Sequence, residues 1–335
     1  MKRICVLPGD GIGPEVISCA TRVLEATGID AELLHGEIGQ SSFRKNGEHL
    51  PAETLHLMRD SDSCLFGAVT TPSDPSYESP VLRFRKELGL YANLRPVRSL
   101  VRISGREPVD LVIVRENTEG LYTQREVYDD GGVTTMRRVS HVASARIVRF
   151  AIDYALKNGR KRICCVQKAN VLKESDGLFL SVFRGLMGKE GVSLEAEEQL
   201  VDSAAMKLVT EPHKFDVIVT LNLYGDIISD VAAGSAGGLG FAPSGNIGDR
   251  HSVFGPAHGS APDIAGKKLA NPTAAILSGA MMLRHIGFGE AAKNIEDGVK
   301  SVYESGHLTV DVGGRHDSES FTDHVVRKIR EMPSS

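Results

Sequence analysis

The chain has 335 residues, with 39 Lys and Arg against 43 Asp and Glu, which gives a formal net charge of −4. Apolar residues make up 41% of the sequence and charged residues 24%. This composition excludes a disordered chain, and its mildly acidic balance argues against nucleic acid as the main partner. The length is enough for about two domains of ordinary size.

The sequence also argues against a membrane or secreted protein. No stretch reaches the roughly 18 apolar residues of a membrane span, and the N-terminal apolar run is too short for a signal peptide. The cysteines are scattered, without a CxxC pair, which predicts buried reduced thiols. They are Cys5, Cys19, Cys64, Cys164 and Cys165. We therefore expect a cytoplasmic protein with no membrane partner.

Strand-like and helix-like stretches alternate along the chain. A strand is predicted at 3–7 and a helix at 14–28, where Pro14 suits the first turn. Continuous apolar runs predict buried strands at 63–69, 109–114, 162–166 and 215–221. Helical periodicity follows at 144–157, 175–187, 272–286, 290–304 and 321–332. This alternation predicts an α/β protein with a largely parallel sheet. Long loops, rich in Pro and Gly, are predicted at 71–80, 232–248 and 253–271.

The motif Gly-Asp-Gly-Ile-Gly-Pro at 9–14 lies between the first strand and the first helix. It is not a dinucleotide fingerprint, because GxGxxG requires glycine where Pro14 stands. Two interpretations remain. The glycines form a tight turn that lets a ligand approach the backbone, or the turn is purely structural.

A pair of carboxylates follows the strand at 215–221. Asp226 and Asp230 are four residues apart, so they share one helix face, where like charges repel and favour a bound cation. Oxygen ligands of this kind suit Mg²⁺ or Mn²⁺. The alternative is a helix-capping Asp226 beside a solvated Asp230.

Several other polar groups lie near predicted strand ends. Arg115 follows the strand at 109–114, and such arginines bind carboxylates in a bidentate manner, although many pair only with surface acids. Tyr122 and Lys168 would serve as general acid and base if their pKa values are lowered; the alternative for Lys168 is a solvent-facing side chain. The small-residue loop at 254–272 could place backbone amides along a nucleotide, or be a plain surface loop.

Taken together, these segments resemble the β-decarboxylating dehydrogenases, which act on isocitrate, 3-isopropylmalate, homoisocitrate and tartrate. The resemblance runs from LPGDGIGPEV through LYANLRPV, VIVRENTEGLY, QKANVLK, NLYGDIISD, PSGNIGD and HGSAPDIAGKKLANPTAAILS to VDVGG. VDLVIVRENTEGLY and PSGNIGD look most like the homoisocitrate branch. The resemblance implies NAD as cofactor, Mg²⁺ or Mn²⁺, and a small hydroxy di- or tricarboxylate as substrate.

The resemblance also implies a fold and an assembly. The fold is an isocitrate/isopropylmalate dehydrogenase-like, two-domain α/β fold with a large mixed sheet, and not a Rossmann fold. Residues 1–96 plus 238–335 would form a discontinuous cofactor-binding domain, and 97–237 the substrate, metal and dimerisation domain. The chain would form a homodimer, or a tetramer, whose active sites are shared between subunits.

Functional roles carry over residue by residue. The resemblance implies that the malate carboxylates are bound by Arg85, Arg95 and Arg115. Tyr122 would protonate the enol, and Lys168, from the partner subunit, would help remove the hydroxyl proton. The implied metal ligands are Asp202, Asp226 and Asp230, with Asp202 crossing the interface. The implied cofactor residues are Thr70, Thr71, Asn222, His258, Gly259, Ser260, Ala261, Asp263, Ile264 and Asn271, with Asp263 holding the adenosine ribose.

Substrate specificity is expected from the segment 78–85. The implied substrate residues are Ser79, Val81, Leu82, Arg83 and Asn170. Val81 and Leu82 would suit the methyl groups of isopropylmalate, whereas Arg83 or Ser79 would suit the distal carboxylate of homoisocitrate. Homoisocitrate is the first choice, 3-isopropylmalate the second and isocitrate the third. A non-catalytic regulatory subunit and a nucleotide-binding module without chemistry are remote alternatives, because the metal carboxylates, the tyrosine and the lysine are all present.

The chain departs from the usual family sequence at two further places. The cofactor loop reads FGPAHG instead of FEPVHG, so Gly255 and Ala257 replace a Glu and a Val. Gln167 precedes Lys168 where a His or Asp is usual.

Overall fold

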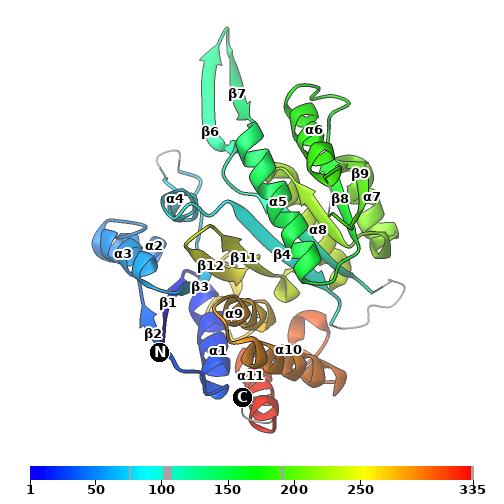
Figure 1. Cartoon of the computed structure of the whole chain (residues 1–335). Helices are drawn as coiled ribbons and strands as arrows, with labels where there is room; N and C mark the ends of the chain where they lie inside the picture. The colour runs from blue at the N-terminus through cyan, green and yellow to red at the C-terminus, as the bar shows by residue number, and fades with distance from the viewer. Residues whose placement is uncertain (75–76, 101–107, 190–191, 333–335) are drawn as a thin grey trace. The chain divides into compact units, whose positions relative to one another are not determined.

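The computed structural model describes residues 1–74, 77–100, 108–189 and 192–332 (Figure 1). The chain forms two compact units. Unit 1 comprises Met1–Leu88 and Gly237–Ser335, and unit 2 comprises Gly89–Ala236. Unit 1 is therefore built from both ends of the chain.

The first boundary between the units differs from the expected one at 96/97. That position lies inside strand β4 (Ala92–Arg98), which pairs along its whole length with β5 (Asp110–Glu116) of unit 2. Because the two strands share a continuous antiparallel ladder, β4 belongs entirely to unit 2. The boundary accordingly lies between Leu88 and Gly89.

Unit 1 is a mixed sheet covered by helices. Its strand order is β2 (Ala31–His35), β1 (Lys2–Gly9), β3 (Ser63–Ala68), β12 (Ser252–Pro256), β11 (Pro243–Ile247). Neighbours are parallel except β11 and β12. Its helices are α1 (Gly13–Ala26), α2 (Gln40–Asn46), α3 (Ala52–Asp60), α4 (Pro80–Glu87), α9 (Thr273–His285), α10 (Gly289–Glu304) and α11 (Ser318–Arg330). Helices α1, α9, α10 and α11 pack on one another, and α9 lies against β3, β11 and β12.

Unit 2 has the strand order β4, β5, β10 (Val217–Thr220), β8 (Arg162–Gln167), β9 (Glu195–Leu200). Only β4 and β5 are antiparallel. Its helices are α5 (His141–Lys157), α6 (Ser175–Met187), α7 (Val201–Thr210) and α8 (Asn222–Ala236). A separate hairpin of β6 (Gly120–Asp129) and β7 (Gly132–Arg138) projects from this unit (Figure 1).

The core of unit 2 explains why its strands read as unbroken apolar runs. Leu111 and Ile113 of β5 pack in one cluster with Ala204 of α7 and Ile228 of α8. Alternate residues of a strand face opposite sides, so Val112 points to the other face, which α5 covers. Both faces are buried, and the parallel strands end at a common edge.

The apolar runs and helical periodicities all correspond to strands and helices of the structure. Two of the predicted long loops were wrong in part, because 232–248 contains β11 and 253–271 contains most of β12. The Pro and Gly of β11 predicted a loop, but this segment is a strand whose residues are all buried. All five cysteines are buried free thiols, and burial raises the pKa of Cys164 to about 12. Within the described residues, no helix combines the length and apolar character needed to cross a bilayer.

Candidate functional site

Unit 2 gathers charged side chains at the carboxyl ends of its parallel strands. Arg115 is near the end of β5, Asn222 begins α8 just after β10, and Lys168 directly follows β8. Ligands of α/β proteins bind at this edge, where loops and helix starts leave polar groups free to converge.

Arg115 is the most deeply placed charge of this set, with 1% of its surface exposed. Its Nε and Nη2 atoms donate to Asn222 Oδ1 at 3.1 and 2.8 Å, and its Nη1 donates to Asp226. Asn222 Nδ2 in turn donates to the Glu119 carbonyl oxygen at 2.9 Å. The Asn222 amide thus orients Arg115; its predicted contact with the cofactor stays a prediction.

Arg95, on β4, reaches the same place from the neighbouring strand. Its Nε donates to Asn93 Oδ1 at 2.7 Å and its Nη1 to Ser229 Oγ at 2.5 Å. Its guanidinium also pairs with Asp226 at 3.1 Å and with Asp230 at 3.5 Å. Burial, and next the positive charge of Arg115, lower the pKa of Arg95. Two guanidinium groups are therefore forced together beside two carboxylates.

Asp226 and Asp230 lie on one face of α8, as their spacing predicted. Helix α8 begins at Asn222, so Asp226 is inside the helix and the helix-capping alternative was wrong. Their side chains remain 36% and 56% exposed, so both carboxylates are accessible to a ligand. Burial raises the pKa of Asp230, and the neighbouring Asp226 adds to this effect. Two adjacent accessible carboxylates provide the oxygen donors that Mg²⁺ or Mn²⁺ prefers.

Tyr122, on β6, completes this cluster. Its hydroxyl donates to Asp226 Oδ2, and the Arg115 guanidinium lies over its ring, 4.9 Å from the centroid. Burial and the hydrogen bond to Asp226 raise the pKa of Tyr122. From the sequence, a role in acid–base chemistry was expected only if this pKa were lowered, but a raised pKa keeps the phenol protonated, which suits a proton donor.

Lys168 and Asp202 form a second cluster. Lys168 Nζ pairs with Asp202 Oδ1 at 2.5 Å, and this contact lowers the pKa of Asp202. Asp176 is fully buried, and its carboxylate accepts from the Lys168 backbone N–H at 2.7 Å and from Arg137. Gln167, the departure before the lysine, accepts from the Ala169 N–H at 2.6 Å. These contacts fix the loop that carries Lys168.

The carboxylates predicted to hold the metal do not all meet within one chain. Among the described residues, a single group of three or more His, Cys, Asp or Glu brings one ligand atom from each within 4.8 Å of the others, and it contains none of Asp202, Asp226 and Asp230. Asp202 pairs with Lys168, whereas Asp226 and Asp230 lie beside Arg95. A metal site made of all three carboxylates would therefore need the Asp202 of a second copy of the chain, or a rearrangement within unit 2 that brings Asp202 to Asp226 and Asp230.

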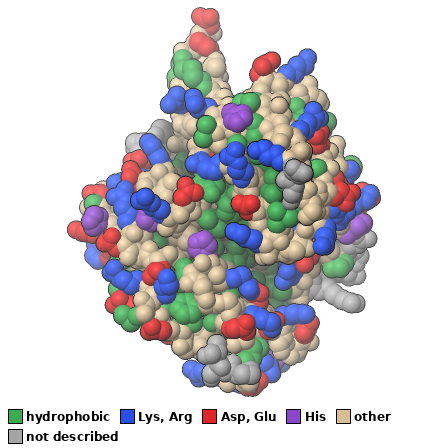
Figure 2. Space-filling model, in the orientation of Figure 1, with side chains coloured by type: hydrophobic (Ala, Val, Ile, Leu, Met, Phe, Trp, Pro, Cys, Tyr) green, Lys and Arg blue, Asp and Glu red, His purple; other side chains and the backbone are tan. Residues whose placement is uncertain are grey.

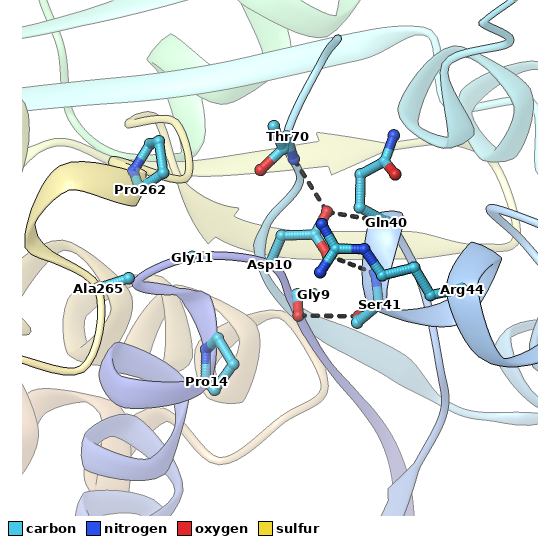
Figure 3. Close-up of a pocket in the computed structure, with 10 residues that line it drawn as sticks. All are labelled: Gly9, Asp10, Gly11, Pro14, Gln40, Ser41, Arg44, Thr70, Pro262 and Ala265. Carbon is cyan, nitrogen blue, oxygen red and sulfur yellow. Dashed lines mark hydrogen bonds between the residues drawn. The ribbon is translucent and has the colours of Figure 1, made fainter.

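In unit 1, a cavity of about 390 Å³ lies between the motif at 9–14, helix α2, Thr70 and the segment with Pro262 and Ala265 (Figure 3). The buried Asp10 carboxylate accepts from the N–H groups of Gln40, Ser41 and Thr70 at 2.8–3.0 Å. A β-carbon on Gly11 would lie 1.9 Å from the Ser260 carbonyl oxygen. That glycine, at φ +60°, thus admits the protein's own backbone, which favours the structural interpretation of the turn.

The predicted cofactor loop lies at this cavity. Thr70 Oγ1 donates to Ser260 Oγ at 2.9 Å, while Thr71 is exposed. The buried His258 Nε2 has no hydrogen-bond partner among the described residues, and burial lowers the pKa of this ring. Ala261 holds a strained left-handed conformation with φ +37°. An orphaned ring nitrogen beside a strained loop fits a site that a polar ligand completes.

The other predicted cofactor residues differ in exposure and in the hydrogen bonds that they make within the protein. The Asp263 carboxylate is exposed and makes no hydrogen bond or ion pair with any described residue, so it is available to ribose hydroxyls. Gly259 has open space where a β-carbon would point, and Ile264 is half-buried. Asn271 is buried, donates to Asp311 at 3.0 Å and accepts from the Thr273 N–H at 3.0 Å. It supports the start of α9 in this structure.

Helix α4 carries the predicted specificity residues. Ser79 caps the helix by accepting from the Leu82 N–H at 3.4 Å, and Val81 and Leu82 are half-buried. Arg83 Nη1 donates to the Leu50 carbonyl oxygen at 3.1 Å, a contact that sequence could not reveal. Arg85 Nε donates to Asn246 Oδ1 at 3.0 Å.

The residues that support these groups were not predicted from the sequence. They include Asn93, Ser229, Asn246, Asp176 and Gly225. A β-carbon on Gly225 would lie 2.6 Å from Arg115 Cγ, so only glycine lets α8 pack on this arginine. A glycine inside a helical pattern was the available signal. Similarly, a β-carbon on Gly255 would lie 2.3 Å from the Phe66 carbonyl oxygen, which explains glycine at that departure.

Comparison with known proteins places this geometry in a family. A profile described as isocitrate/isopropylmalate dehydrogenase matches residues 3–329. The chain is 48% identical to the isocitrate/homoisocitrate dehydrogenase of Thermus thermophilus over 98% of this chain and 99% of that protein. It is 45% identical to the 3-isopropylmalate/3-methylmalate dehydrogenase of Methanocaldococcus jannaschii over 99% of this chain and 100% of that protein.

Solved structures agree. The crystal structure of isocitrate dehydrogenase from Methylococcus capsulatus superimposes with a TM-score of 0.95 at 42% identity, and covers 98% of this chain and 100% of that one. These likenesses confirm the predicted α/β fold and the predicted enzyme class of oxidative decarboxylating dehydrogenases. The chain belongs to the isocitrate/isopropylmalate dehydrogenase family.

Proposed function

We propose that this enzyme oxidises and decarboxylates a 3-substituted malate with NAD⁺ and Mg²⁺ or Mn²⁺, and that homoisocitrate, converted to 2-oxoadipate, is its preferred substrate. The observation that carries the proposal is the convergence on Asp226. Arg95, Arg115 and the Tyr122 hydroxyl all contact this carboxylate, and Asp230 lies one helical turn away. Carboxylate-binding cations, a proton donor and metal-binding oxygens thus share one place.

The residues of the chain divide the work of the reaction. Arg95 and Arg115 bind carboxylates of the substrate and so fix the hydroxyl-bearing carbon. Lys168, once it has given up its own proton, would help remove the hydroxyl proton as the hydride leaves that carbon. The resulting ketone then loses CO₂, and Tyr122, held protonated by burial and by Asp226, gives a proton to the enol carbon. When bound, a divalent cation polarises the hydroxyl and the ketone, and NAD⁺ accepts the hydride.

NAD⁺ is proposed as the cofactor because of the chemistry of the 258–264 loop. Asp263 presents a free carboxylate, which can accept from both ribose hydroxyls and repels a 2′-phosphate. His258 Nε2 is buried without a partner among the described residues, so a ligand donor or acceptor there would relieve the energetic penalty.

A homodimer with shared sites is proposed from two features of unit 2. Exposed apolar side chains gather on the projecting β6–β7 hairpin, where Val127, Tyr128, Val133 and Met136 are 44–86% exposed (Figure 2). Such a patch on a two-stranded hairpin needs a partner surface. In addition, Asp202 is bound to Lys168 and does not join Asp226 and Asp230 within one chain. We propose that Lys168 and Asp202 complete the site of the partner subunit. A cytoplasmic location stays a prediction.

The sharing of sites is testable by mixing two inactive variants. Tyr122→Phe and Lys168→Met would each be inactive as homodimers. If the two residues serve different sites, a mixed dimer has one intact site, and an equal random mixture should recover roughly a quarter of wild-type activity. If each site is built from one chain, the re-assembled mixture stays as inactive as its components. The control contains the same two variants as intact homodimers, combined without dissociation and re-assembly of their subunits.

The substrate is tested by a panel of 3-substituted malates with NAD⁺ and Mn²⁺, comparing kcat/KM from NADH formation. We expect homoisocitrate to rank first. A higher value for 3-isopropylmalate would mean that the half-buried Val81 and Leu82 decide specificity; isocitrate is the third candidate. If no member of the panel yields NADH, the proposal fails, and a non-catalytic regulatory subunit becomes the better interpretation.

A further inference from the structure

Unit 1 contains a cluster of imidazoles that the proposed reaction does not use. His307 follows α10, His316 precedes α11 and His324 lies on α11. One ring nitrogen from each lies within 4.8 Å of the others, and all three side chains are half-buried. The His307 and His324 rings stack with centroids 3.9 Å apart, and His316 lies edge-on to both at 5.0–5.1 Å.

The backbone holds these histidines in place. The segment between α10 and α11 folds back on itself, because the His316 N–H donates to the Leu308 carbonyl oxygen at 3.1 Å. Gly314 permits this turn, since a β-carbon there would lie 1.9 Å from the same oxygen. Asp317 then caps α11 by accepting from the Ser320 N–H at 2.8 Å, which fixes the helix that carries His324. The backbone that carries these histidines is therefore fixed by the fold.

The spacing of the nitrogens matches that of a transition-metal site. His307 Nδ1 and His316 Nε2 are 3.2 Å apart. Around a tetrahedral ion with metal–nitrogen bonds of about 2.0–2.1 Å, neighbouring ligand nitrogens are about 3.3–3.4 Å apart. A cation between these two nitrogens would thus lie at bonding distance from both once the rings turn their lone pairs toward it. His324 is stacked on His307, so its ring would have to turn out of the stack for a nitrogen lone pair to point at the same ion.

The surroundings of His324 disfavour its protonated form. Burial, and then the charges of His307 and His316, lower the pKa of His324; Arg327 acts in the same direction and Asp323 opposes it. Protonating the three rings together would place like charges in contact, whereas one cation bound to three neutral rings avoids that repulsion.

We propose that His307, His316 and His324 bind one transition-metal ion of the Zn²⁺ type, with water as the fourth ligand. Imidazole nitrogens suit Zn²⁺, Ni²⁺ and Cu²⁺, and not the Mg²⁺ that the carboxylates of unit 2 would take. The three side chains are only half-buried, so solvent can supply that water. The bound ion ties the 307–316 segment to α11 and stabilises unit 1. This inference is independent of the proposed function.

The test uses Co²⁺ as a spectroscopic probe for the tag-free, metal-stripped full-length enzyme, with Mg²⁺ in excess. We expect one equivalent of Co²⁺ to give the strong visible absorption of a tetrahedral nitrogen site, and Zn²⁺ to abolish it. Octahedral Co²⁺ at carboxylates absorbs far more weakly. His316→Asn and His324→Asn should each weaken binding at least roughly tenfold, as removal of a metal-supporting group typically does. His35→Asn, at an exposed histidine outside the cluster, is the matched control and should bind Co²⁺ as the wild type does.

A second measurement guards against misfolded variants. Zn²⁺ should raise the Tm of the wild type and of His35→Asn, with reversal by a chelator, but should leave the Tm of His316→Asn unchanged. Asp226→Asn should keep the cobalt signal, because its carboxylate belongs to unit 2. If the wild type gives no tetrahedral signal, or if His316→Asn and His324→Asn keep it, the proposal is overturned and the cluster is only a hydrogen-bonded group of histidines.

Discussion

Gly225→Ala should displace Arg115 from its position against helix α8, although alanine by itself favours the helix. In an unobstructed helix, replacing glycine with alanine is favourable by roughly 0.5–1 kcal/mol, because glycine loses more backbone entropy on folding. At position 225 the new β-carbon would lie 2.6 Å from Arg115 Cγ and 2.7 Å from its Cβ. Carbon atoms in contact are normally about 3.5–4.0 Å apart, so the arginine must move by about 1 Å.

The magnitude follows from the matched position on the same helix. Gly234 of α8 is exposed, and a β-carbon added to it would meet nothing within 4 Å, so Gly234→Ala receives the helical gain alone. Overpacking a buried site costs about 1–3 kcal/mol, and the two variants should therefore differ in stability by about that amount. Arg115 also binds Asn222 and Asp226, so its displacement spreads to the candidate metal ligand. A misplacement of about 1 Å typically costs roughly 100-fold in rate.

The assay compares both variants with the wild type by thermal unfolding and by kcat/KM for the hydroxy acid. Gly234→Ala should unfold at the same or a higher temperature with unchanged kinetics. Gly225→Ala should unfold at a lower temperature than Gly234→Ala and lose most of its activity. If both variants match in Tm and kcat/KM, Arg115 is not held against this glycine in solution, and its assigned position in the site is wrong.

Asp226→Asn should abolish activity even at saturating Mn²⁺, well beyond the roughly 10- to 100-fold that groups supporting a metal ligand contribute, while circular dichroism stays native. Wild-type turnover would remove Asp226 from the metal site. Asp263→Lys should narrow the ratio of kcat/KM for NAD⁺ over NADP⁺; equal values for the wild type would contradict the ribose role. Arg83→Ala should cost homoisocitrate ~1.5–3 kcal/mol more than isopropylmalate, about 10- to 150-fold in kcat/KM. Because Arg83 also donates to the Leu50 carbonyl oxygen, an equal loss on both substrates would assign it a structural role.

The strands and helices of the core could be predicted because the pattern of apolar residues in the sequence indicates which segments are buried. The run VDLVIV around β5 is apolar without alternation, as expected for a strand covered by helices on both faces. Strand β11 escaped prediction because its sequence, PSGNI, has neither β-branched runs nor alternation. It is a strand through its ladder with β12, a contact between segments that no local pattern announces.

Only those residues of the candidate site that belong to recognisable sequence motifs could be predicted. The spacing of Asp226 and Asp230 placed both on one helix face, and the structure agrees. The hydrogen bond from Arg95 to Ser229 joins β4 to α8 across 134 residues of sequence, whereas the bond from Arg95 to Asn93 lies within β4. Such supporting contacts depend on tertiary packing, so single-sequence reasoning gave no sign of them. Arg83 likewise donates to a backbone oxygen, a contact that its helix position did not predict, and its contact with the substrate stays a prediction.

The charges around Asp226 predict that metal binding and substrate binding are coupled. Sequence alone suggested that Asp226 and Asp230 repel each other until a cation binds, but Arg95 and Arg115 already balance them. Two guanidinium groups and two carboxylates sum to zero, so a divalent cation alone would leave an excess of two positive charges in a partly buried cluster. A substrate with two or three carboxylates removes that excess and gives the arginines new partners. Each ligand should therefore bind more tightly in the presence of the other, by the same factor. Titration of Mn²⁺ with and without a non-reactive malate analogue measures this coupling, and equal Mn²⁺ affinities would show that the arginines stay with Asp226 when the acid binds.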